Sequence, residues 1–274
     1  MTGLDGLAAR PLFLLGMPRS GTTWLSQMFE SSPDFLVRLS PNYSHPLKNQ
    51  IDLSATRDDW INHLSAAAES DDAFMTQNWR RDTGELATFA STTDVVQYLA
   101  IKDTRFHDLY QRAMELLPDA LTIYVVRHPG GAINSWWQSE EFPPDADIVE
   151  EWRSGECRKQ APGEYWGFSD WCRLTERYLD LEEQAPHRFR VFRYEDLVWE
   201  RERVSADLFA FVGCEVPPST QAFLGESKSR HDDRSYSVYK DPSVAGRWRS
   251  ELPLEICSSI GSDLAGTRLA RFAQ

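Results

Sequence analysis

The sequence lacks the features that mark secreted and membrane-spanning proteins. Its four cysteines lie far apart and form no CxxC pair, which predicts reduced thiols rather than a disulfide framework or a zinc site. No apolar run reaches the roughly 18 residues of a membrane-spanning helix, and no signal peptide is recognisable at the N-terminus. These absences predict a cytoplasmic protein with no transmembrane segment and no metal site.

Positive charge is also scarce. The 274 residues include 29 Lys and Arg against 42 Asp and Glu, giving a formal net charge of −13. Such an acidic chain is not expected to bind nucleic acid. Hydrophobic residues make up 41% and aromatic residues 12%, as in folded soluble proteins. A local cluster of Arg and Lys in such an acidic chain is therefore more informative, because it runs against the overall excess of negative charge.

The sequence does contain a glycine loop between an apolar strand and a helix. Residues 12–15 are typical of a strand, 16–21 of a turn and 22–30 of a short helix. Such a loop directs backbone N–H groups and a helix N-terminus at an anion. The glycine spacing matches a Walker A phosphate-binding loop, but Thr22 stands where that motif requires Lys. The nearest fixed cation is Arg19, inside the loop.

Strands alternate with helices along the chain, as judged from apolar runs and helical spacing. The expected strands are 12–15, 35–39, 95–101, 121–126 and 188–193, and the expected helices are 22–30, 58–68, 106–117, 130–137, 165–184, 204–212 and 254–265. This order predicts a three-layer α/β/α fold, with a central, mainly parallel sheet flanked by helices as in P-loop NTPases. We expect a single domain over 1–274, with acceptor-facing insertions near 40–92 and 139–163 and a mobile segment near 226–249.

Polar residues follow four of the predicted strands, where ligands bind in folds of this class. They are Arg19 in the glycine loop, 102–105, Arg127 and 194–196. A magnesium-dependent NTPase would carry an Asp at the end of a neighbouring strand. Arg127 occupies that place instead, and an arginine repels a metal ion and attracts a second anionic group.

Two motifs resemble those of sulfotransferases that use 3′-phosphoadenosine 5′-phosphosulfate (PAPS). Residues 18–25 are similar to the 5′-phosphosulfate loop of that family, and 124–135 to its 3′-phosphate motif, including the Arg-x7-Ser spacing. The two motifs also occur in the order found in the family. The resemblance covers the core from 12 to about 197. It implies metal-free transfer of a sulfuryl group from PAPS to a hydroxyl or amine of a small-molecule, lipid or carbohydrate acceptor.

The resemblance also implies which residues bind the cofactor. They are Arg19, Ser20, Gly21, Thr22, Thr23 and Trp24 at the 5′-phosphosulfate, Arg127 and Ser135 at the 3′-phosphate, and Tyr194 near the base. A core tyrosine at a strand end is the alternative for Tyr194. The C-terminal loop of the family is matched only in part, because the Arg-Lys-Gly of cytosolic members is missing. Lys240 and Arg247 are the replacements that this chain offers, and a solvated basic stretch explains them equally well.

Two cations are predicted to act in the reaction. Attack on sulfur requires fixed positive charge at the sulfuryl oxygens and at the departing phosphate. The resemblance implies that Arg19 stabilises the phosphate. Lys102, at a predicted strand end, is expected to hold the sulfuryl oxygens, with an ordinary surface lysine as the alternative.

The general base is less defined by the sequence. Members of the family carry a histidine two residues after the lysine, or a glutamate after the first helix. This chain has Thr104 at the first position and no acid in 38–46. We predict His45 as the base, because imidazole titrates in the required range. His107 and Asp103 remain alternatives.

Two other functions fit part of the sequence. An ATP-dependent, P-loop kinase-like enzyme would share the loop, but the Walker lysine and the strand-terminal Asp are absent. A non-catalytic nucleotide-binding homologue would explain the missing family base. For the acceptor, the acidic segment 140–151 either forms a solvated face or favours a cationic or neutral group. The tryptophans between 136 and 171 either pack in the core or line an acceptor pocket.

Overall fold

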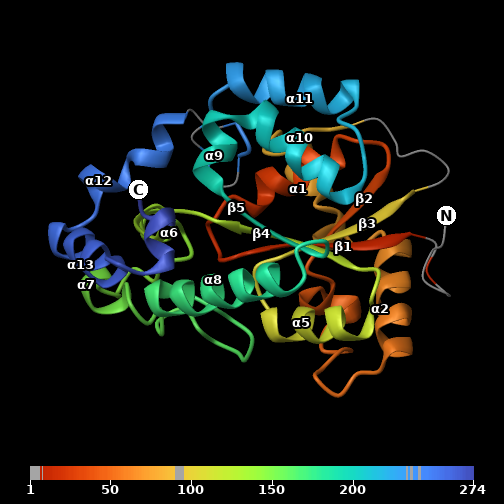
Figure 1. Cartoon of the computed structure of the whole chain (residues 1–274), viewed down its shortest axis with the longest axis horizontal. Coiled ribbons are helices and arrows are strands. Elements are labelled where there is room, and N and C mark those ends of the chain that lie inside the picture. Colours follow the sequence, from red (N-terminus) through yellow and green to blue (C-terminus); the bar gives the residue numbers. More distant parts are fainter. Residues whose placement is uncertain (1–6, 8, 90–95, 233, 235–236, 240–241) are drawn as a thin grey trace.

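A five-stranded, wholly parallel sheet in the order β2-β3-β1-β4-β5 forms the centre of the described part of the chain (Figure 1). The computed structural model describes residues 7, 9–89, 96–232, 234, 237–239 and 242–274. The strands are β1 (Arg10–Gly16), β2 (Phe35–Leu39), β3 (Tyr98–Asp103), β4 (Leu121–Val126) and β5 (Phe189–Arg193). The predicted fold class is therefore confirmed.

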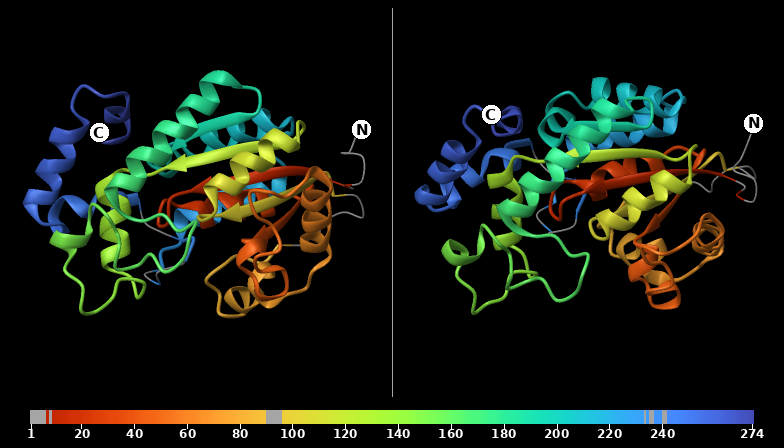
Figure 2. Two further views of the ribbon diagram at one scale, coloured as in Figure 1. Left: turned by 90° about the horizontal axis from the view of Figure 1, so that it is seen from below. Right: turned by 60° about the horizontal axis from the view of Figure 1, so that its bottom comes forward.

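Helices cover both faces of the sheet, as the turned views in Figure 2 show. One face carries α1 (Thr22–Glu30), α10 (Arg201–Val212) and α11 (Pro218–Ser229), and the other carries α2 (Arg57–Glu69), α5 (His107–Leu116) and α8 (Gly167–Gln184). The remaining described helices are α3 (Ala73–Thr76), α4 (Asn78–Asp82), α6 (Pro129–Trp137), α7 (Ile148–Glu151), α9 (Tyr194–Trp199), α12 (Trp248–Glu251) and α13 (Leu254–Leu264), with one-turn 3-10 helices η1 (Pro41–Tyr43), η2 (His45–Leu47), η3 (Pro242–Gly246) and η4 (Arg268–Phe272).

The central strand explains why the sheet needs two helical layers. Phe13 and Leu15 pack into the core beneath α2, α5 and α8, whereas Leu12 and Leu14 pack into the core beneath α1 and α10. Successive side chains of a strand point to opposite faces, so a strand covered on both faces is apolar throughout. Burial of each such side chain contributes about 1.5–3 kcal/mol. This burial fixes β1 as the central strand of the sheet, so the loop that follows it lies in the middle of the row of strand ends.

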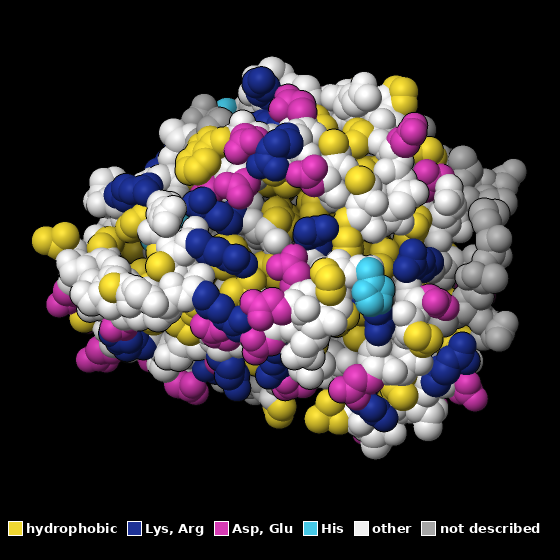
Figure 3. Space-filling view, in the orientation of Figure 1, with side chains coloured by type: hydrophobic (Ala, Val, Ile, Leu, Met, Phe, Trp, Pro, Cys, Tyr) yellow, Lys and Arg dark blue, Asp and Glu magenta, His cyan; other side chains and the backbone are white. Residues whose placement is uncertain are grey.

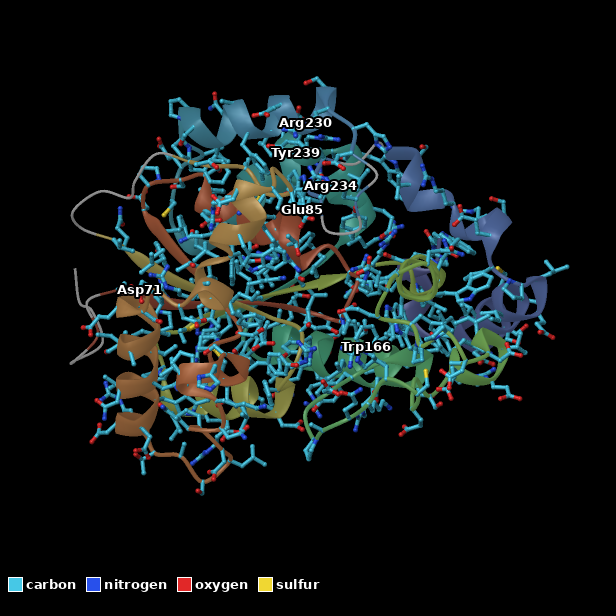
Figure 4. All side chains as sticks on the ribbon, turned by 180° about the vertical axis from the view of Figure 1, so that it is seen from behind. Asp71, Glu85, Trp166, Arg230, Arg234 and Tyr239 are labelled. Carbon is cyan, nitrogen blue, oxygen red and sulfur yellow. The ribbon has the colours of Figure 1, made fainter. Side chains whose placement is uncertain are left out.

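The structure differs from the sequence-based prediction in two segments. Strand β3 extends through Lys102 and Asp103, which are buried although both are charged. The segment near 226–249 is not simply a surface stretch, because it begins in α11 and because Val238 and Tyr239 are buried in the core beside α10. Figure 4 shows Tyr239 near Arg234, whose guanidinium donates to the Gly84 carbonyl at 3.0 Å.

The C-terminal elements α12 and α13 pack beside α6, at the opposite end of the molecule from the start of β1 (Figure 1). An ion pair of 2.7 Å between Arg153 and Asp263 joins this end to the segment after α7. None of the described helices is long and apolar enough to cross a membrane. All four cysteines are free.

Candidate active site

A cleft of about 390 Å³ lies at the carboxyl ends of the central strands. Its walls come from the loop after β1, the end of β3, the residue after β4 and the first turn of α9. Of the residues predicted from the sequence, the cleft is lined by Arg19, Gly21, Thr22, Thr23, Trp24, Lys102, Arg127, Ser135 and Tyr194. Parallel pairing of β3, β1 and β4 thus brings residues that are distant in the sequence to one site.

The glycine loop has the backbone form of an anion cradle. Arg19 and Gly21 adopt left-handed conformations with φ of 67° and 91°. A Cβ at Gly21 would collide with the ring of Tyr194, so only glycine allows this ring to close over the loop. Helix α1 then begins at Thr22 with no side-chain cap, which leaves its first N–H groups for a ligand. The buried Ser20 hydroxyl likewise has no hydrogen-bond partner among the described residues.

The two arginines of the predicted anion sites lie side by side. Arg127 Nη1 donates to the Arg19 carbonyl oxygen at 2.9 Å, and Arg19 Nε donates to Ser135 Oγ at 3.2 Å. Arg127 also lies over the Tyr194 ring, 5.1 Å from its centroid. Its Nε atom is buried and has no partner in the described part of the chain. A buried donor without a partner is costly, so an anion bound here would satisfy it.

Lys102 is not an ordinary surface lysine. Its side chain enters the cleft from β3, and Nζ donates to Thr23 Oγ1 at 3.1 Å, beside the start of α1. The residue is only 7% exposed. Burial, followed by the charge of Arg80, lowers the pKa of Lys102 to about 7. An anion bound at this position would stabilise the protonated lysine.

The three predicted bases lie away from the cleft walls. His45 is exposed at the start of η2 and does not line the cleft. His107 is buried 3.0 Å from the Tyr178 hydroxyl, and burial lowers its pKa to about 3. Asp103 is buried, where it accepts the Tyr110 O–H at 2.8 Å and two backbone N–H groups. This placement favours none of them as the base, and Asp103 instead stabilises the turn after β3.

Glu141 is the one carboxylate among the described residues that line the cleft. Its Oε2 atom lies 4.0 Å from Arg19 Nη1, and its side chain is 26% exposed. The neighbouring Phe142 packs edge-on against the buried Trp136 at 5.0 Å, which fixes the turn that carries the glutamate. No role of its own was predicted for Glu141 from the sequence. Its position in the sequence could have indicated a place in the cleft, because Glu141 follows closely after the helix that carries Ser135.

The cleft is strongly cationic although the chain is acidic. Its walls carry the basic side chains of Arg19, Arg80, Lys102, Arg105, Arg127, Arg158 and Arg201. On the face shown in Figure 3, Lys and Arg side chains gather across the middle of the molecule, mixed with Asp and Glu. Arg80, Arg158 and Arg201 were not expected in the cleft, because they come from α4, a loop and α10, outside every recognised motif.

Of the two residues predicted to bind from the C-terminal loop, the structure describes only Arg247. Arg247 is exposed and is not among the residues that line the cleft. Lys240 lies outside the described residues. Trp248, which directly follows Arg247, stacks on His128 with ring centroids 3.9 Å apart and so lies close to Arg127 in the chain's second motif.

The tryptophans divide between core and cleft. Trp136, Trp152 and Trp171 are buried in the hydrophobic core beneath α8. Trp166, which Figure 4 labels, also lines the cleft. Of the described residues, no group of three or more His, Cys, Asp or Glu is arranged to hold a metal ion.

The central glycine loop lacks the Walker lysine and lies beside a second arginine at the next strand end. Together they form a cationic cleft at the carboxyl ends of a parallel sheet. The chain belongs to the sulfotransferase family, whose sequence profile matches residues 11–218. The family resemblance read from the two motifs is thereby confirmed. No curated protein sequence matches the chain.

Solved structures show the same fold at low sequence identity. Mouse sulfotransferase SULT7A1, complexed with PAP, is 15% identical with a TM-score of 0.55, over 96% of this chain and 87% of that one. The sulfotransferase domain of the Synechococcus PCC 7002 olefin synthase is 17% identical with a TM-score of 0.52, over 96% and 97%. Retinol dehydratase, in complex with androsterone and inactive cofactor PAP, is 11% identical with a TM-score of 0.52, over 94% and 82%.

Proposed function

We propose that this protein transfers the sulfuryl group of PAPS to a hydroxyl or amine of a small-molecule, lipid or carbohydrate acceptor. The observation that carries the proposal is the meeting of the Arg19 loop with Arg127 and Ser135 in one cleft. Two separate anionic groups on one nucleotide fit this arrangement. PAP in the related mouse structure supports the same donor.

Residues that line the cleft, together with the buried Ser20 of the loop, would hold the donor from end to end. The loop N–H groups, the Ser20 hydroxyl and Arg19 would hold the 5′-phosphosulfate, and Arg127 with Ser135 would hold the 3′-phosphate. The unpartnered Ser20 Oγ and Arg127 Nε atoms support this assignment. Tyr194, which closes over Gly21, would lie beside the nucleotide. The donor supplies an activated sulfuryl group, and no residue of the cleft has to be modified covalently.

Three side chains would perform the transfer. Glu141 takes the proton of the acceptor as the acceptor oxygen or nitrogen bonds to sulfur. Lys102 neutralises charge on the sulfuryl oxygens. Arg19 stabilises the phosphate oxygen, which keeps the electron pair of the breaking S–O bond. The proximity of Glu141 to Arg19 and the burial of Lys102 support this division of roles.

The binding of PAPS is expected to depend on pH through Lys102. The pKa of Lys102 is about 7, so the side chain is cationic below pH 7 and loses its charge above it. The affinity for PAPS, relative to 3′,5′-ADP, should therefore fall by up to about tenfold per pH unit above that value. Calorimetric titration of both nucleotides between pH 6 and about 9 measures this ratio.

Lys102→Arg is the control for this dependence, because a guanidinium stays protonated throughout the range. The ratio of affinities should then be independent of pH. An equal slope in the wild type and in Lys102→Arg would show that another group titrates.

Thermal unfolding tests the donor itself. We expect 3′,5′-ADP to raise the melting temperature more than either 5′-AMP or ADP with magnesium. At a hundredfold excess over Kd, a ligand specific for the folded state adds about 2.7 kcal/mol to the free energy of unfolding. Equal shifts with 3′,5′-ADP and 5′-AMP would rule out recognition of the 3′-phosphate. A shift with ADP and magnesium alone would favour a kinase-like enzyme.

A further inference from the structure

The cleft has a second cationic region, away from the predicted nucleotide site. Sheet order separates the two, because β4 and β3 flank opposite sides of β1. Arg127 follows β4, whereas Arg105 follows β3. A backbone hydrogen bond of 2.8 Å from Phe106 to Gly163 joins the segment that carries Arg158 to this β3 side. The region therefore lies on the β3 side of the cleft, together with Lys102, which the proposed function assigns to the sulfuryl oxygens.

Among the described residues, the one carboxylate that pairs with an arginine of this region is Glu164, and it pairs with Arg105 alone. Arg105 pairs with Glu164 at 3.3 Å. Burial raises the pKa of Glu164, but hydrogen bonds and the charges of Arg105 and Arg158 more than offset this and lower it. Glu164 therefore offsets the charge of Arg105, and the charge of Arg158 remains. Arg158 makes no ion pair of its own within the described part of the chain, although it lines the cleft.

Aromatic rings accompany these arginines. Arg105 lies over Tyr43, 4.3 Å from the ring centroid, and Arg158 lies 5.5 Å from the centroid of Trp166. Phe74 packs 5.7 Å from Tyr43. All three rings line the same cleft. Rings placed below guanidinium groups restrict these side chains and offer an apolar surface beside a positive charge.

We propose that the acceptor carries an anionic group, a carboxylate, sulfate or phosphate, beside an aromatic or other apolar body, and that Arg105 and Arg158 bind this anionic group. This inference rests on the proposed sulfuryl transfer and specifies the class of its acceptor. It differs from the expectation of a cationic or neutral acceptor drawn from the acidic segment 140–151. Of the four glutamates in that segment, only Glu141 lines the cleft.

Calorimetric titration of the 3′,5′-ADP complex with phenyl phosphate and with phenol tests the inference. Phenyl phosphate should bind at least about tenfold more tightly, because only the charged ligand forms an ion pair, with bidentate hydrogen bonds, to a guanidinium. Arg158→Ala should remove most of this preference, and Arg158→Lys should retain part of it. Arg190→Ala is the matched control, because Arg190 also lies over a ring, 5.4 Å from the Phe211 centroid, but does not line the cleft.

Two results would overturn the inference. One is equal affinity for phenyl phosphate and phenol. The other is a preference that survives Arg158→Ala but disappears in Lys102→Ala, because the phosphate would then occupy the position of the sulfuryl group. Failure of the proposed function is distinguishable, since it would appear as no binding of 3′,5′-ADP to the wild type. In that case the same titrations without nucleotide still decide whether Arg158 binds the anion.

Discussion

Glu141→Gln is expected to lower the rate of sulfuryl transfer by about 10²–10⁴-fold, the usual contribution of a general base. The amide keeps the size of the side chain but cannot accept the proton. The Glu141 carboxylate lies 4.0 Å from Arg19 Nη1, which is a weak ion pair. The substitution should therefore change the affinity for 3′,5′-ADP little. Rates are measured with PAPS and an acceptor chosen from a panel of alcohols, phenols and amines. Nucleotide affinity is measured by calorimetry on the same preparation.

His45→Ala is the matched control, because His45 was the base predicted from the sequence and is exposed outside the cleft. It should leave the rate unchanged. Glu141→Asp should recover part of the lost rate, since a carboxylate is present again at a greater distance. A large loss in His45→Ala together with a normal rate in Glu141→Gln would reverse the assignment.

Arg127→Ala is expected to weaken the binding of 3′,5′-ADP by about 10–100-fold, while the affinity for 5′-AMP stays within about twofold. The variant loses the guanidinium assigned to the 3′-phosphate. It also loses the hydrogen bond to the Arg19 carbonyl. The ratio of the two affinities separates these effects, because any change in the loop weakens both nucleotides alike. Calorimetry gives both constants.

Arg153→Ala serves as the control for this variant. Arg153 lies over the Trp152 ring at 4.1 Å, much as Arg127 lies over Tyr194, but it is paired with Asp263 and does not line the cleft. Both affinities should match the wild type. If Arg127→Ala weakened both nucleotides equally, Arg127 would support the loop without recognising the 3′-phosphate.

Local patterns in the sequence were sufficient to predict the strand and the helix that flank the site. Strand β4 was predicted with its observed bounds, because a continuous β-branched run needs burial on both faces. Helix α1 was also predicted correctly, between a glycine loop and the break at 31–33. Strand β3 was placed too early. The polarity of Lys102 and Asp103 indicated a surface end, whereas contacts with Thr23 and Tyr110 keep both residues buried.

The individual residues on the acceptor side of the cleft could not be predicted in this way, although Glu141 and Arg158 both lie in the insertion expected near 139–163. Glu141 is held there because Phe142 packs on Trp136, and Arg158 because its loop is tied to the end of β3. Both contacts depend on tertiary packing and leave no periodic pattern in the sequence. Such segments are connections between elements, where binding residues often occur without a local signature.

Transfer of ³⁵S from labelled PAPS tests the central claim most directly. The protein is incubated in EDTA with the acceptor panel, extended by members that carry a carboxylate or phosphate, and both the labelled product and 3′,5′-ADP are quantified. We predict equal amounts of the two products, with the highest rates for anionic acceptors. PAPS that stays intact with every acceptor, although it binds to the protein, would contradict sulfuryl transfer, and a requirement for added magnesium would contradict the metal-free mechanism.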